Sequence, residues 1–281
     1  MILEQLFFHP KKNKVSSPDN FEYEYSECWI PKAGGGNLHA WEFRPYSQAP
    51  EKNITVIHLH GNYGNITYHF SAVAWLTRLG YRVLVFDYSG YGESDGKVSP
   101  TQIQIDVASV WNYSVEQWGR SEQFIILGQS LGGFLALKVV PNLPNNDKLL
   151  AVVTEGAFSS FQEMVEDRVA SNWFFRTFMN WAPRLVEASL RVESEKMEGT
   201  QTPILMIHGS DDMIVPIQQG HKLFNSLKSL DKTWWEIPNG GHLDAFSLYD
   251  FFFRRKLSDF LDVRSGLRQL NQKVLLVDGK R

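Results

Sequence analysis

Short runs rich in Val, Ile and Leu alternate with helical stretches along most of this chain, and this alternation limits the folds open to it. Near-continuous apolar strands between helices are typical of a mostly parallel sheet that is covered on both faces. The helix at 99–118 has Ser99 as its expected N-cap and Pro100 at its first position. The apolar runs lie at 54–60, 81–88, 124–128, 149–155, 203–209 and 233–238, and the other helices at 68–79, 130–140, near 217–229 and near 245–262.

Two further strands, 21–30 and 37–44, precede this pattern and are joined by a glycine-rich turn, which predicts an antiparallel hairpin. The 281 residues fit a single α/β domain, residues 1–281, better than two independent domains. The segment from about 157 to 200 separates two strands and is expected to form a small helical cap. Right-handed crossovers bring the carboxyl ends of parallel strands to one edge, where such folds bind ligands.

Composition limits the binding partners and the cellular location that we expect for this protein. A formal net charge of -3 gives no electrostatic reason to expect nucleic acid. Cys28 is the only cysteine, which excludes an internal disulfide and a cysteine-rich zinc site and favours a reducing, cytoplasmic location. No apolar run reaches the roughly 18 residues that span a bilayer. Residues 2–8 do not read as a signal peptide; we expect them to pack on the protein, with weak membrane-surface contact as the alternative.

Residues 128–132 (GQSLG) form a G-x-S-x-G sequence between a predicted strand and a predicted helix. In this context the serine lies on a strained turn that holds its hydroxyl clear of the sheet, and small residues on either side avoid clashes. The helix N-terminus then lies beneath a developing oxyanion. Ser130 is therefore the candidate nucleophile, and a tight turn with an exposed serine is the plain alternative.

Residues 60–65 (HGNYGN) follow the first of the apolar runs, where the oxyanion loop of such a site belongs. The backbone N–H of Asn62, together with that of Leu131, is predicted to bind the tetrahedral oxyanion. Tyr63 is expected to face the substrate. The alternative is an ordinary glycine-rich connection that His60 braces by hydrogen bonds.

Residues 208–216 (HGSDDMIVP) follow the strand 203–209 and place a carboxylate downstream of the serine. Such a carboxylate can reach a histidine in the loop after the last strand. Asp211 and Asp212 compete for this role, and Glu155 is a remoter candidate that is better explained as structural.

Residues 239–242 (NGGH) follow the last strand, and two glycines let this loop carry an imidazole over the sheet edge. His242 is the candidate base because it alone has both this position and the chain order serine, acid, histidine. His58 and His221 have plainer explanations, in a strand and on a helix surface. Asp87 is expected to brace its loop rather than to catalyse.

Together these motifs resemble those of the abhydrolase-domain serine hydrolases. The patterns H-G-N-x-G-N, D-Y-x-G-Y-G-x-S-x-G, G-x-S-L-G-G and H-G-x-x-D-x-x-V-P occur in order, and the resemblance covers about residues 20–262. It implies the α/β-hydrolase fold, a triad of Ser130, Asp212 and His242, and neither metal nor cofactor. It also favours Asp212 over Asp211.

The resemblance leaves the substrate open, since such families include protein depalmitoylases, lysophospholipases and bacterial esterases. Two departures are visible. Many relatives carry an N-terminal hydrophobic anchor, of which this chain has at most residues 2–8, and Arg is common where this chain has Ser89.

The expected cap is rich in aromatic rings. Three consecutive rings cannot all face one side of a helix, so some face the cleft or the solvent. Four rings are predicted to line a pocket for an acyl chain or an aromatic ester, and a role in pinning the cap to the body stays equally open. The four are Trp173, Phe174, Phe175 and Phe178; Arg168, Arg176 and Arg184 leave an acidic head group possible.

The leading hypothesis is hydrolysis of carboxylic esters or acyl thioesters of small or lipid-like substrates through an acyl-enzyme. An amide or peptide hydrolase, such as an aminopeptidase, is the second; it needs an anionic anchor, for which Glu163, Glu166 and Asp167 are loose candidates. A non-catalytic interaction protein of the same fold is the third, and four intact motifs argue against it. Dehalogenase and dienelactone chemistries are disfavoured because the elbow carries Ser.

Overall fold

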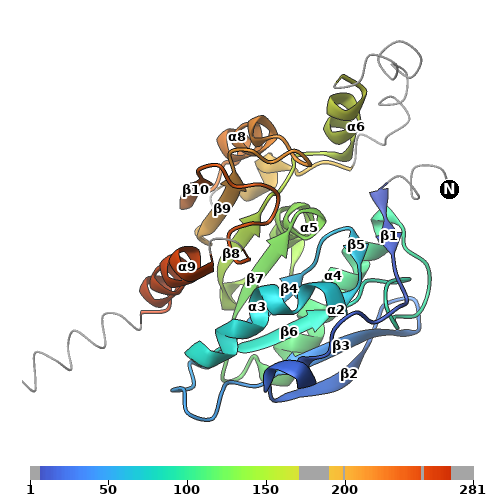
Figure 1. Cartoon of the computed structure of the whole chain (residues 1–281), viewed down its shortest axis with the longest axis vertical. Helices are drawn as coiled ribbons and strands as arrows, with labels where there is room; N and C mark the ends of the chain where they lie inside the picture. The colour runs from blue at the N-terminus through green and yellow to red at the C-terminus, as the bar shows by residue number, and fades with distance from the viewer. Residues whose placement is uncertain (1–6, 171–189, 199, 248–249, 267–281) are drawn as a thin grey trace, which may run out of the picture.

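The computed structural model describes residues 7–170, 190–198, 200–247 and 250–266, and an eight-stranded sheet forms its centre (Figure 1). The strand order is β10-β9-β8-β7-β4-β6-β3-β2. Neighbours from β10 to β6 run parallel, while β3 pairs antiparallel with both β6 and β2. The bounds are β2 Tyr25–Pro31, β3 Asn37–Phe43, β4 Ile54–Leu59, β6 Arg82–Phe86, β7 Gln123–Gln129, β8 Leu149–Glu155, β9 Ile204–Gly209 and β10 Lys232–Ile237. The predicted parallel sheet and the hairpin are confirmed.

Helices cover both faces of this sheet (Figure 1). Side chains of α4, α5, α6 and α8 share one apolar core with the strands, and those of α2, α3 and α9 share a second. Successive residues of a strand point alternately into the two cores: Ile57 of β4 is in the first core and Val56 is in the second. Alternation of this kind makes every central strand apolar on both sides. The helices are α2 Ile66–His69, α3 Ser71–Ala74, α4 Pro100–Trp118, α5 Leu131–Val139, α6 Phe161–Ala170, α8 Ile217–Ser226 and α9 Asp250–Arg264.

One helix prediction is wrong in detail. The segment expected to form a single helix at 68–79 consists of α2, α3 and a 3-10 helix, η2 (Trp75–Leu79). Phe70 lies at the first break, where its buried ring stacks on Phe43 at 5.9 Å. The indole N–H of Trp75 donates to the Ala72 carbonyl at 2.8 Å, at the point where the α-helix gives way to the tighter 3-10 helix. Packing against the sheet therefore overrides the local helical pattern.

The N-terminal segment packs on the loop that follows β4. Strand β1 (His9–Pro10) pairs in parallel with β5 (Tyr63–Gly64), and the sequence did not predict this small sheet. Phe8 is buried, and Phe7 contacts Phe161 edge to face at 4.7 Å. None of the helices in the described residues is both long enough and apolar enough to cross a bilayer.

Only part of the expected cap lies within the described residues. It begins with α6, and an isolated bridge joins Ser160 to Arg191 before the 3-10 helix η6 (Ser194–Met197). The four rings predicted to contact substrate all lie outside the described residues: Trp173, Phe174, Phe175 and Phe178.

Candidate active site

Ser130 lies on the sharp turn between β7 and α5. Its backbone has φ 53° and ψ -113°, a strained conformation for a residue with a side chain. Two glycines make the turn possible. A Cβ at Gly128 would meet the carbonyl of Gly132 at 2.2 Å, and one at Gly132 would meet the carbonyl of Leu59 at 1.8 Å. The G-x-S-x-G spacing is therefore a requirement of close backbone packing.

Asp212 and His242 are brought together from two different loops, after β9 and after β10. The carboxylate oxygen Oδ2 lies 2.7 Å from Nδ1 of the imidazole. The other oxygen, Oδ1, accepts backbone N–H groups of Ile214 and Val215, each at 2.9 Å. Burial alone would raise the pKa of Asp212, but these hydrogen bonds and the charge of His242 bring its pKa below the ordinary value.

This arrangement fixes the tautomer of His242. An ionised carboxylate can only accept hydrogen bonds, so Nδ1 carries the proton and donates it to Asp212. Nε2 is then left with its lone pair, which is the form a general base requires.

The neighbouring carboxylate, Asp211, faces outward and is exposed. It accepts the Ser210 hydroxyl at 3.0 Å, and its backbone N–H donates to the Gly240 carbonyl at 2.9 Å. Of the two adjacent aspartates, only Asp212 therefore reaches His242. His208 lies on the inner side, where its Nε2 donates to the Val215 carbonyl at 2.8 Å.

The loop after β4 approaches the serine directly. A Cβ at Gly61 would lie 3.8 Å from the Cβ of Ser130. The Asn62 side chain is engaged elsewhere, donating to the Phe7 carbonyl at 3.1 Å. Within the described residues, the backbone N–H groups of Asn62 and Leu131 donate no hydrogen bond. Two unengaged N–H groups beside a serine are what an oxyanion hole needs. The ring of Tyr63 is half exposed.

A buried polar network lies behind the serine; the sequence analysis singled out Glu155 as structural but did not foresee its partners. Glu155, at the end of β8, accepts the Gln129 amide at 2.7 Å and the Ala245 backbone N–H at 2.8 Å. The side-chain amide oxygen of Gln129, Oε1, lies 3.0 Å from Nε2 of His58. Burial raises the pKa of Glu155 and lowers the pKa of His58 to about 3. An acidic residue at the end of an otherwise apolar strand was the available signal.

Gly156 was also missed. Its φ is +62°, and a Cβ there would lie 2.9 Å from Cε1 and 3.1 Å from Nδ1 of His242. The imidazole therefore rests against the backbone of the residue that follows Glu155. A side chain at this position would push the ring from its place.

Two cavities lie near these elements. One of about 270 Å³ runs beside the serine and histidine loops; its lining includes Tyr68, His69, Gln129, Leu243, Phe246 and Arg254. A second, of about 340 Å³, lies between α6 and α8 and is lined by Ser159, Glu163, Leu190 and Lys222 among others. Of these two cavities, the first borders residues next to Ser130 and His242, namely Gln129 and Leu243.

Comparisons with known proteins assign the family. Residues 54–191 match the family model described as alpha/beta hydrolase fold, and residues 175–244 match one described as serine aminopeptidase, S33. The Escherichia coli protein YfhR is 30% identical over 259 residues, which cover 91% of this chain and 86% of YfhR. A Saccharomyces cerevisiae protein named as a membrane protein, YNL320W, is 26% identical over 239 residues, covering 83% and 79%.

Among solved structures, the Pyrococcus furiosus esterase Pf2001 has a TM-score of 0.71 at 17% identity, with 91% of this chain and 97% of that chain covered. The chain belongs to the α/β-hydrolase family, which confirms the expected fold. Within that family it is similar to YfhR over most of its length.

Proposed function

We propose that this α/β-hydrolase is a serine hydrolase that cleaves carboxylic esters or acyl thioesters. The observation that carries the proposal is the 2.7 Å contact between Asp212 and His242, formed by loops far apart in sequence. It lies at the same sheet edge as Ser130, whose turn presents a serine in a strained backbone conformation. A nucleophile, a base and a group that orients the base are the parts of a Ser–His–Asp site.

The proposed mechanism follows from these roles. Nε2 of His242 takes the proton of the Ser130 hydroxyl while its oxygen attacks the substrate carbonyl carbon. The backbone N–H groups of Asn62 and Leu131 stabilise the resulting oxyanion, and Asp212 stabilises the imidazolium. His242 then returns the proton to the leaving alcohol or thiol. Water attacks the acyl-enzyme by the same route, and the acid is released.

Amide or peptide hydrolysis is the second candidate, because one matching family model is described as a serine aminopeptidase. The carboxylates suggested as anchors for an amine are engaged with other groups. Glu163 pairs with Lys222 at 2.8 Å, Glu166 accepts from Gln162, and Asp167 accepts from Gln219. The name of Pf2001 as an esterase adds support to ester cleavage.

We further propose a cytoplasmic protein that touches membrane surfaces weakly through its N-terminus, where a lipid-like acyl substrate would be available. The single cysteine supports the first part. The name of YNL320W as a membrane protein supports the second. Retention on anionic vesicles that is lost when Lys11, Lys12 and Lys14 are replaced by Gln would support the contact, and equal retention of both forms would contradict it.

A fluorophosphonate probe tests the nucleophile. We expect wild type to be labelled at Ser130, and Ser130→Ala to be unlabelled, because an activated serine attacks such electrophiles. Ser121→Ala, which removes an exposed serine, is the matched control and should label normally. Labelling that persists in Ser130→Ala would contradict the assignment of Ser130 as the nucleophile. A panel of p-nitrophenyl esters, acyl thioesters and aminoacyl p-nitroanilides then separates the two substrate classes.

A further inference from the structure

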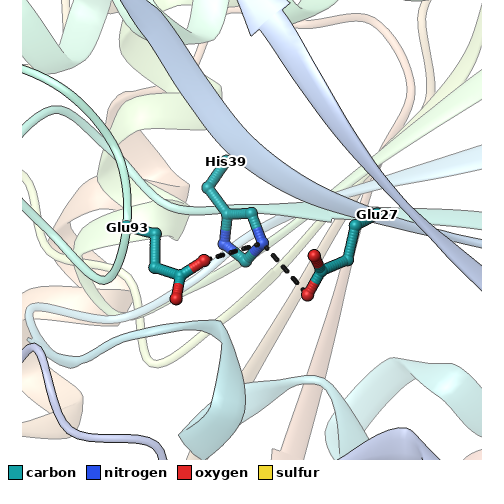
Figure 2. A group of neighbouring side chains, drawn as sticks. All are labelled: Glu27, His39 and Glu93. Carbon is teal, nitrogen blue, oxygen red and sulfur yellow. Dashed lines mark ion pairs between the residues drawn. The ribbon is translucent and has the colours of Figure 1, made fainter.

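Glu27, His39 and Glu93 form a cluster of three side chains near the β2–β3 end of the sheet (Figure 2). None of them belongs to the proposed triad or oxyanion loop. Glu27 is on β2 and His39 on β3, and they are diagonal neighbours, because Glu27 pairs with Trp41 and Trp29 pairs with His39. Glu93 comes from the loop after β6 and approaches the imidazole from the other side (Figure 2).

The separations within the cluster suit one shared cation. Nε2 of His39 lies 3.6 Å from Oε1 of Glu27 and 3.7 Å from Oε2 of Glu93, and the three atoms lie within 4.8 Å of one another. Both contacts are too long for a hydrogen bond. Three atoms at these separations can be equidistant from one ion at roughly 2.0–2.4 Å, which covers the bond lengths of zinc and similar ions to nitrogen and oxygen.

His39 supplies an independent reason to expect a ligand. Its side chain is 98% buried, yet neither ring nitrogen has a hydrogen-bond partner among the described residues. A buried imidazole without a partner is costly, and native proteins satisfy nearly all such groups. Nε2 faces the two carboxylates, so a bound cation would satisfy it.

The other ring nitrogen faces a suitable outer partner. Nδ1 of His39 lies 3.6 Å from Oδ2 of the buried Asp87. Metal-bound histidines commonly direct their second ring N–H at a carboxylate, which fixes the tautomer and orients the ring. Asp87 is itself held in place, since its Oδ1 accepts the Ile66 backbone N–H at 2.9 Å. The cluster therefore has the outer carboxylate typical of metal sites.

We propose that Glu27, His39 and Glu93 bind a divalent transition-metal ion, Zn²⁺ in first place, that ties the β2–β3 hairpin to the loop after β6. One imidazole with two carboxylates favours Zn²⁺ over Mg²⁺, which prefers oxygen ligands alone. Lys14 contacts Oε1 of Glu93 at 3.0 Å and leaves Oε2 directed at His39. The indole N–H of Trp41 donates to Oε1 of Glu27 at 3.2 Å, which orients that ligand.

The position of the site defines its role. The loop that carries Glu93 also supports the candidate oxyanion loop: the Tyr88 hydroxyl donates to the His60 carbonyl at 3.0 Å, and the Tyr91 hydroxyl donates to the Asn62 carbonyl at 2.8 Å. The ion would stiffen this support without touching a reacting atom. It acts as a structural clamp, so its presence is compatible with metal-independent chemistry at Ser130.

Calorimetric titration of the full-length, chelator-treated protein with zinc chloride tests the proposal. We expect one equivalent to bind and the melting temperature to rise, because the ion binds the folded state only. Glu27→Gln and Glu93→Gln change half-exposed side chains and should fold normally. Each should weaken zinc binding by at least about tenfold and reduce the thermal shift. Magnesium chloride should give no comparable heat.

His221→Gln is the matched control, because it removes an exposed histidine whose Nε2 lies 3.9 Å from Glu236. It should bind zinc as wild type does. The proposal is overturned if wild type binds no zinc, or if both glutamate variants bind it as tightly as wild type does. His39→Asn is a further variant, and the two glutamate variants decide the question even if it does not fold.

Discussion

Glu155 ends strand β8 and Asp212 follows the adjacent parallel strand β9, and both lie near His242, yet their surroundings differ. Glu155 is fully buried and accepts one side-chain amide and one backbone N–H. Asp212 accepts hydrogen bonds from Nδ1–H of the His242 imidazole and from two backbone N–H groups. Burial raises the pKa of the first carboxyl. Hydrogen bonds bring the pKa of the second below its ordinary value despite burial.

Position at the sheet edge therefore does not by itself distinguish the carboxyl group that contacts His242, the proposed acid, from the one that does not. Donors that favour the charged form make Asp212 the better partner for a developing imidazolium. Glu155 instead fastens the end of β8 to the segment after His242 through Ala245, so it positions the histidine loop. Substitutions of the two carboxyl groups and of their neighbours should separate these two roles.

The largest effect is expected from Asp212→Asn. Turnover should fall by on the order of a thousandfold or more with the fold retained, because the imidazole loses the partner that sets its tautomer and stabilises its cation. Asp211→Asn is the control and should cost much less. Steady-state kcat is measured for both variants; near-normal turnover in Asp212→Asn would contradict its role as the acid, and a larger loss in Asp211→Asn than in Asp212→Asn would exchange the two roles.

Gly156→Ala should have the next largest effect. The new Cβ would meet His242 at 2.9 Å, and displacement of a catalytic group by a fraction of an ångström to 1 Å can cost about a hundredfold in kcat. Gly34→Ala is the control, since Gly34 also has a positive φ, +90°, but no atom within 4 Å of a built Cβ. Similar kcat values for these two variants would show that His242 does not depend on this contact.

Glu155→Gln should reduce stability more than activity. Both Glu155 oxygens accept hydrogen bonds, and an amide places its NH₂ against one of the two donors, so unfolding should become easier by about 1–3 kcal/mol. The double variant Gln129→Glu with Glu155→Gln restores a donor and an acceptor in opposite places and should recover part of the loss. Urea unfolding of the three proteins measures this, and no recovery in the double variant would contradict a direct pair.

The smallest effect is a difference in pH dependence. The pKa of Asp212 is lowered on folding from 3.8, so its contribution is present above pH 3.8 and is lost as the pH falls through the folded value. The pKa of Glu155 is raised from 4.5, so stability is lost as the pH rises above 4.5 through the folded value. Asp212→Asn and Glu155→Gln should therefore alter the pH dependence of the unfolding free energy with opposite signs. Changes of the same sign in the two variants would contradict the opposite pKa shifts of Asp212 and Glu155.

Features determined by local sequence were predictable. The apolar runs at 54–60, 149–155 and 203–209 became β4, β8 and β9 with boundaries shifted by one residue at most, because buried parallel strands need apolar side chains at every position. The turn at Ser130 was also predictable, because its close backbone packing leaves no room for side chains at Gly128 and Gly132, and these two glycines are visible in the sequence.

Features determined by tertiary contacts could not be predicted from the sequence. Nothing adjacent to Gly156 in sequence reveals that an imidazole rests on it, and the two partners of Glu155, Gln129 and Ala245, come from two distant segments. His39 looked like one residue of an ordinary strand until the loop after β6 placed Glu93 beside it. The helix expected at 68–79 broke because Phe70 packs into the core.

The pairing of β1 with β5 has a practical consequence for anyone handling the protein. The His9 backbone N–H donates to the Asn62 carbonyl at 3.0 Å, and the Phe7 carbonyl accepts the Asn62 side chain. The side chain of Asn65 donates to two further carbonyls of the same segment, those of Lys11 and Asn13, each at 2.9 Å. Residues 7–13 are therefore part of the scaffold of the candidate site: a truncation that begins at the main sheet would release the loop that faces Ser130, and a purification tag or surface tether joined next to this segment would pull on that loop.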